Sequence, residues 1–224
     1  MTNAKRINTG RGVIVCTLLC LLTDVVYASA VSVTVLKADG QGLADAVVVA
    51  ETSQGYPAVH GVLKSAIDQR DLMFVPEVLV VRTGTSVDFP NSDQVRHQVY
   101  SFSAAKNFQL PLYAGRTHPP VLFDHAGLVT LGCNIHDGMI GYIYVTDSPW
   151  YGRTDSTGKL HLSDLPAGSF TVKVWHPHWN EGHQPLEQPI KLDEGQTGEV
   201  TVKLKKPLQN SVHHHGTGRR WKAY

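Results

Sequence analysis

The sequence is short of cysteine and carries no excess of either charge. Only three cysteines occur among 224 residues, at Cys16, Cys20 and Cys133, and the formal net charge is +1. A disulfide-rich framework is therefore not expected, and there is no electrostatic reason to expect nucleic acid or an anionic membrane surface as a partner. The G-x-S-x-G motif and a glycine-rich phosphate loop are both missing, so nothing indicates a serine hydrolase or a nucleotide-binding enzyme.

Long apolar runs are also scarce, and the one near the N-terminus is short. It extends from Val13 to Leu22, follows Lys5, Arg6 and Arg11, and precedes small residues that end at Ala30. This order is typical of a secretory signal peptide, and the run is too short to span a bilayer. We therefore expect residues 1–30 to be a signal peptide cleaved near Ala30. The mature protein would be periplasmic, without a membrane span.

Removal of the signal peptide leaves Cys133 as the only cysteine. A single cysteine in an oxidising compartment has no disulfide partner, and a free thiol there is a liability unless something occupies it. The residues around Cys133 are therefore the first place to look for other metal ligands.

The chain also has little helical periodicity. Short runs rich in β-branched residues fill it after residue 31. Typical runs are VSVTVL, AVVVAE, LVTLGC, GYIYVT and FTVKVW, separated by turn signals such as ADGQG, RTGT and STGK. Many short strands with regular turns predict an all-β fold of sandwiches or barrels. Only the segment 103–109 has a weak helical pattern.

Three segments look like parts of one motif, although the first lies far from the other two in the chain. VTVLKADGQGLADAVVVAE (Val33–Glu51) reads as a hairpin, and TDSTGKLHLSDLPAGSFTVKVWHP (Thr154–Pro177) and EGQTGEVTVKLKK (Glu194–Lys206) follow roughly one domain later. Joined end to end, the three pieces resemble the carboxypeptidase-regulatory-like or transthyretin-like β-sandwich.

The resemblance implies a discontinuous domain with a guest inside it. We expect a host of residues 31–54 and 149–206, a guest of residues 55–148, and a disordered tail of residues 207–224. The alternative is two consecutive domains, with the N-terminal strands belonging to the guest.

The guest segment contains four side chains of the kinds that bind copper. Cys133, His136 and Met139 recur at intervals of three in LGCNIHDGMIGYIYV, and His97 follows a separate strand. Two imidazoles and a thiolate with a weak axial thioether make an electron-transfer copper site. Each residue alone is more often a loop histidine, a small buried hydrophobe or core filler. Their joint occurrence at these spacings favours a metal site.

The same segment resembles the cupredoxins, the plastocyanin and amicyanin class of type 1 copper proteins. The similarity extends from Leu72 to His97 and from Val121 to Val145, and the short Cys-x2-His-x2-Met spacing is that of amicyanin. The resemblance implies a Greek-key β-sandwich and one type 1 copper ion held by His97, Cys133, His136 and Met139. Asn91 would fix the loop before His97. Gln98 departs from the family, which commonly has Asn at this position.

On this resemblance the protein is an electron carrier rather than an enzyme. A c-type cytochrome or a periplasmic dehydrogenase would be its partner, and it would dock on an apolar patch around His136 that includes Ile135 and Ile140. Two alternatives remain: a copper-handling protein that does not shuttle electrons, and an interaction module in which copper is a structural detail.

Other histidines offer a second metal site as a minority interpretation. His176, His178 and His183 lie together in VWHPHWNEGH, and His213, His214 and His215 lie in the tail. Beside Trp175 and Trp179, the first three could instead only cap a sheet edge. We expect His118 and His125 to be loop residues.

Overall fold

The computed structural model describes residues 28–115, 118–179 and 184–209. These residues form strands and turns without an α-helix, so the prediction of an all-β chain is confirmed. None of the described residues belongs to a helix that could cross a membrane. The predicted signal peptide lies almost wholly outside the described residues, as do His183 and the tail from residue 210.

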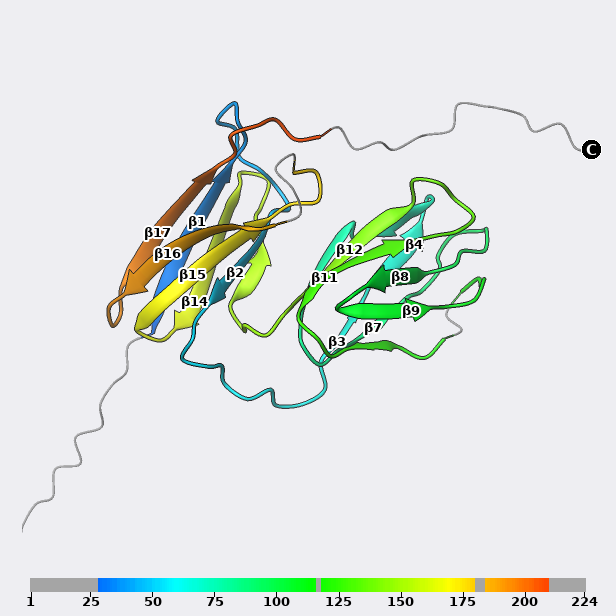
Figure 1. Ribbon diagram of the computed structural model, residues 1–224, viewed down its shortest axis with the longest axis horizontal. Helices are drawn as coiled ribbons and strands as arrows, with labels where there is room; N and C mark the ends of the chain where they lie inside the picture. The colour runs from blue at the N-terminus through cyan, green and yellow to red at the C-terminus, as the bar shows by residue number, and fades with distance from the viewer. Residues whose placement is uncertain (1–27, 116–117, 180–183, 210–224) are drawn as a thin grey trace, which may run out of the picture.

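Seven strands from the two ends of the chain form what we call the terminal sandwich (Figure 1). One sheet has the order β14-β1-β17 and the other the order β13-β2-β15-β16. The strands are β1 (Ser29–Leu36), β2 (Val47–Glu51), β13 (Tyr151–Arg153), β14 (Lys159–Leu165), β15 (Gly168–Trp175), β16 (Leu186–Leu192) and β17 (Thr197–Lys203). The first and last strands pair in parallel, with Ala30 opposite Thr197 and Leu36 opposite Lys203.

The ten strands between β2 and β13 pair among themselves and form the central sandwich (Figure 1). Its sheets have the orders β6-β12-β11-β8-β9 and β10-β7-β3, with a separate β4-β5 hairpin. The strands are β3 (Lys64–Ala66), β4 (Asp68–Arg70), β5 (Met73–Val75), β6 (Val78–Arg82), β7 (Thr85–Asp88), β8 (Tyr100–Ser103), β9 (Lys106–Gln109), β10 (Val121–Phe123), β11 (Gly127–Gly132) and β12 (Ile140–Thr146).

The burial patterns of β1 and β2 show how many faces of each strand are covered. Side chains of β1 alternate between buried and partly exposed along SAVSVTVL, as in a strand with one face on a core. In β2 the four residues Val47 to Ala50 are all buried, because Val48 and Ala50 face the terminal core while Val47 and Val49 pack with Trp175 and Val78. The continuous apolar run therefore marks a strand covered on both faces.

The two sandwiches share an apolar contact along these outer faces. Trp175 of β15 is 2% exposed and packs edge-on against Tyr142 of β12, with ring centroids 5.4 Å apart. Tyr144 of the same strand lies 6.0 Å from the Trp175 ring. Strand β12 therefore extends from the loop that carries His136 to the contact with the terminal sandwich.

One segment and two boundaries differ from the patterns read in the sequence. The segment 103–109 is not helical: β8 and β9 form an antiparallel hairpin in which Ser103 pairs with Lys106. Pairing with the sheet through β11 outweighs the weak helical propensity of this segment. Strand β1 begins at Ser29, and Ala30 already pairs with Thr197, so cleavage at Ala30 would remove two residues of the strand. At the other end, Leu208 packs on the terminal core and the Gln209 amide donates to the His178 carbonyl, so the first residues of the predicted tail are held.

Candidate metal centre

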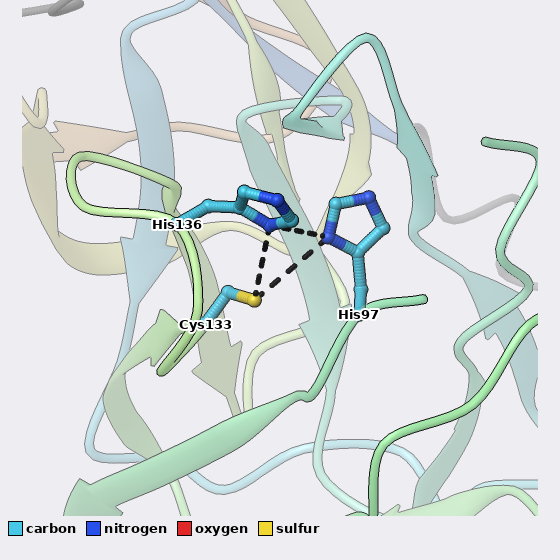
Figure 2. Close-up of side chains that lie close together, drawn as sticks. All are labelled: His97, Cys133 and His136. Atoms are coloured by element: carbon cyan, nitrogen blue, oxygen red, sulfur yellow. Dashed lines mark hydrogen bonds between the residues drawn. The ribbon is translucent and has the colours of Figure 1, made fainter. Parts of the chain in front are cut away.

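Three of the four predicted ligands meet at one end of the central sandwich (Figure 2). The Nδ1 atoms of His97 and His136 lie 3.0 Å apart. The Sγ atom of Cys133 lies 3.8 Å from the first and 3.7 Å from the second. In the part of the chain that the structure describes, this is the one group of three or more His, Cys, Asp or Glu residues with all ligand atoms within 4.8 Å of one another.

This spacing fits a single metal ion. With bonds of about 2.0 Å to nitrogen and about 2.3 Å to sulfur, ligand atoms around one ion lie roughly 3 to 4 Å apart. Both imidazoles direct the same kind of atom, Nδ1, towards the thiol. A Cys and two His in this arrangement have the donor set of a trigonal copper site.

The fold brings the ligands together from two segments. Cys133 directly follows β11, and His136 lies in the loop that leads into β12. The Met139 amide donates to the His136 carbonyl at 3.2 Å, and Gly138 takes a φ of +84°. The left-handed conformation at Gly138 lets the chain reverse within this short loop. His97 approaches from the loop between β7 and β8, and its amide pairs with the Tyr113 carbonyl.

Met139 is buried, 3% exposed, and belongs to the same core cluster as Cys133. Cys133 itself is 6% exposed and His97 is fully buried, whereas His136 is partly exposed. The centre is therefore closed on the inside and reaches the surface through His136.

Burial lowers the pKa of His136, the neighbouring His97 lowers it further, and the carboxylate of Asp93 acts in the opposite direction. A lower pKa keeps the imidazole neutral at pH 7, and a metal ligand must be in that form.

Asn91 occupies the position predicted for it and fixes the loop before His97. Its Nδ2 donates to the carbonyls of Val95 and Tyr113, both at 2.9 Å, and its Oδ1 accepts from the Asp93 amide. Gln98 also has a partner, because Asn134 Nδ2 donates to its Oε1 at 2.8 Å. The hydrogen bond between Asn134 and Gln98 joins the His97 segment to the Cys133 loop.

Asp93 is a neighbour of the centre that was not predicted from the sequence. Its Oδ2 lies 2.7 Å from Nε2 of His97, on the far side of the ring from Cys133. Burial raises the pKa of Asp93, but hydrogen bonds from the Leu72 amide, His97 and the Asp71 amide outweigh burial and leave the pKa below its ordinary value. An acid four residues before a candidate ligand histidine is the signal that could have indicated it.

Of the second group of histidines the structure describes His176 and His178, and these two do not form a comparable cluster with other described residues. His176 and His178 have ring centroids 5.5 Å apart, the His178 amide donates to Nδ1 of His176, and His178 Nε2 lies 3.0 Å from a Glu77 oxygen. Within the described residues they are not joined by a third ligand atom at metal-binding distance. The geometry instead joins the terminal sandwich to the segment between β5 and β6.

His176 predicts a pH dependence of stability. Burial, followed by the charge of His178, lowers its pKa to about 4 from the ordinary value of 6.5. Between these values the unfolded chain binds more protons than the folded chain, so the free energy of unfolding rises with pH across this window. The neutral His176 side chain contributes about 3 kcal/mol to the free energy of unfolding. This contribution is fully present above pH 6.5 and is lost as the pH falls to 4. Denaturant titrations at several pH values should show a shallower dependence in His176→Asn, whose side-chain oxygen can replace Nδ1 as the acceptor. An unchanged slope would contradict this assignment.

Comparisons with known proteins give fold-level similarities only. No family model matches the chain, and no curated protein does. A purple cupredoxin from Nitrosopumilus maritimus is 21% identical, with 37% of this chain and 99% of that chain covered and a TM-score of 0.34. A copper-containing nitrite reductase from Thermus scotoductus is 25% identical, with 40% of this chain and 25% of that chain covered and a TM-score of 0.35. A mutant of amicyanin in its reduced Cu(I) form is 20% identical, with 39% of this chain and 85% of that chain covered and a TM-score of 0.34. Because all three TM-scores lie below 0.5, the assignment of the centre depends on the geometry of this chain.

Proposed function

We propose that the central sandwich binds one copper ion of type 1 through His97, Cys133, His136 and Met139. The observation that carries the proposal is the convergence of one Sγ and two Nδ1 atoms within 3.8 Å of one another at the end of a β-sandwich. Met139 is buried in the same core cluster as Cys133, which supports its role as the weak fourth ligand. Thiolate and thioether donors favour copper over the hard cations.

A copper ion bound there would supply one-electron chemistry through its Cu(II) and Cu(I) states. The protein's part is to hold the ligands still. His97 is fully buried and fixed by Asp93, while Asn91 and Gln98 join the surrounding loops. Ligands that do not move between charge states keep the reorganisation small, which favours an electron carrier and not an enzyme.

His136 is the proposed exit for electrons, because it is the ligand that reaches the surface. Ile135 and Ile140, in the same loop and at the start of β12, are 50% and 48% exposed. Leu112, next to the Tyr113 that pairs with His97, is 46% exposed. Small apolar surfaces suit a partner that must dissociate quickly. We propose a c-type cytochrome or a periplasmic dehydrogenase as that partner.

We also propose that the two sandwiches are two domains, with residues 55–148 inserted in a transthyretin-like host of residues 31–54 and 149–206. The pairing of β1 with β14 and β17 supports this arrangement. Export to the periplasm with removal of the N-terminal segment belongs to the same proposal. Since Ser29 and Ala30 are strand residues, we place the cleavage before Ser29.

The test is a Cu(II) titration of the purified mature protein, followed by visible absorption. We expect an intense thiolate-to-copper band that saturates at one copper per chain, disappears with ascorbate and returns with ferricyanide. Weak, colourless binding would contradict the proposal, and the histidines outside the centre would then be the better candidates.

A second measurement distinguishes an electron carrier from a copper-handling protein. A carrier should keep its copper through repeated reduction and oxidation in the presence of a Cu(I) chelator. A delivery protein should lose copper to the chelator in the first reduced state. The buried, doubly anchored His97 favours retention.

A further inference from the structure

The tip of the β4-β5 hairpin has an unusual backbone. Arg70 pairs with Met73, so Asp71 and Leu72 form a two-residue loop, and their φ values are +53° and +60°. Two-residue hairpin loops with positive φ at both positions normally contain glycine. Here neither residue is glycine, and the leucine carries a side chain where the left-handed conformation is costly.

One carboxylate stabilises this turn, and it belongs to Asp93 in the loop before His97. Its Oδ1 accepts from the Asp71 amide at 2.7 Å, and its Oδ2 accepts from the Leu72 amide at 3.0 Å. The same Oδ2 lies 2.7 Å from His97 Nε2. The Asp93 side chain is 13% exposed and the His97 side chain is not exposed, so water competes less for the Asp93–His97 contact than for the two bonds to the turn amides, which are exposed.

This geometry decides which nitrogen of His97 carries the proton. An ionised carboxylate only accepts hydrogen bonds, so the nitrogen that faces it must be Nε2–H. In the neutral ring the other nitrogen, Nδ1, then keeps its lone pair, and this atom faces Cys133 and His136. A group that holds one nitrogen of a ligand histidine in this way sets both ring orientation and tautomer.

We propose that Asp93 is a positioning residue that selects the Nε2–H tautomer of His97 and couples this ligand to the Asp71–Leu72 turn. The inference deepens the proposed copper function and rests on it for the identity of the metal. The tautomer and the link to the hairpin are properties of the chain itself. Figure 2 shows the ring of His97 with one nitrogen towards Cys133 and His136 and the other directed away from them.

The chain offers a matched control in Asp68. Its Oδ1 also accepts two backbone amides of this region, from Gln69 at 2.8 Å and Ser92 at 3.2 Å, and its Oδ2 pairs with Arg70. Asp68 thus anchors the same hairpin to the same loop, but its partners do not include His97.

The experiment compares Asp93→Asn with Asp68→Asn in the full mature chain, first without metal. Ring ¹⁵N shifts of His97 should report a protonated Nε2 in the parent and in Asp68→Asn. In Asp93→Asn the amide group can donate to Nε2, so the signal should shift towards the Nδ1–H form. With Cu(II), the affinity of Asp93→Asn should fall about 10- to 100-fold, while Asp68→Asn binds as the parent does.

A third variant controls for the possibility that Asp93→Asn disrupts the Asp71–Leu72 turn. Leu72→Gly accepts the positive φ without strain, so Asp93→Asn in that background keeps the hairpin. Leu72→Gly alone should leave the tautomer and the copper affinity unchanged. The proposal is overturned if Asp93→Asn retains the Nε2–H form, or if Asp68→Asn shifts the tautomer equally. If the parent binds copper without an intense band, the copper function fails while the tautomer result stands.

Discussion

Cys133→Ser is expected to remove the intense visible band completely. The band requires a thiolate bonded to copper, and Cys133 is the only cysteine among the described residues. The serine oxygen is a harder donor that suits copper less well. We expect the copper affinity to fall by more than about 100-fold, because loss of an outer-shell partner alone costs 10- to 100-fold. Absorption and a competition titration with a chelator of known affinity measure both effects.

The control for this variant is Ile135→Ala in the same loop. Ile135 is half exposed, so its truncation should leave the folded structure and the band intact. Its effect should be confined to the rate of electron exchange with a partner. A Cys133→Ser protein that still turns blue would mean that the copper ligand lies elsewhere.

Gly158→Ala should destabilise the terminal sandwich by more than about 4 kcal/mol, a size that requires a specific structural cause. Gly158 has a φ of +79°, and an added Cβ would clash with the Val35 carbonyl oxygen. It would also lie 2.7 Å from the Leu43 nitrogen and 2.8 Å from the Gly42 Cα. These are backbone atoms that cannot move alone. The amide of Val35 also donates to the Gly158 carbonyl, which fixes the turn from the other side.

Gly40→Ala is the matched control for the conformational part of this effect. Gly40 has a φ of +90°, and an added Cβ would have no atom within 4 Å. Its cost should be only the left-handed penalty of roughly 1 to 2 kcal/mol. Denaturant unfolding of both variants, followed by tryptophan fluorescence, gives the difference. Equal costs would show that the packing of the two turns contributes nothing.

Most strands were predictable because their sequences satisfy local rules. The alternation in β1 and β17 and the continuous run in β2 match one-face and two-face burial. The segment 103–109 has a weak helical pattern but forms part of the β8–β9 hairpin, because sheet pairing through β8 outweighed that local preference. The contact of Trp175 with Tyr142 was not predictable, since nothing in either local pattern specifies the partner.

The candidate ligands could be named from the sequence because three of them are close in the chain and the fourth lies in a family-like motif. The geometry now brings His97, Cys133 and His136 together, and Met139 lies in the same core cluster. The ligand role of all four stays a prediction. Asp93 was not predicted from the sequence, because its contacts with the hairpin turn at Asp71 and Leu72 join segments that are distant in sequence.

The pairing of β1 has a consequence for how the chain assembles itself. Both sheet neighbours of β1, namely β14 and β17, lie far downstream, whereas the strands of the central sandwich pair among themselves. A chain made from its N-terminus therefore completes the central sandwich while β1 is still unpaired. Such non-local pairing folds slowly. Until β17 arrives, β1 exposes a β-branched edge that can pair with another copy of itself.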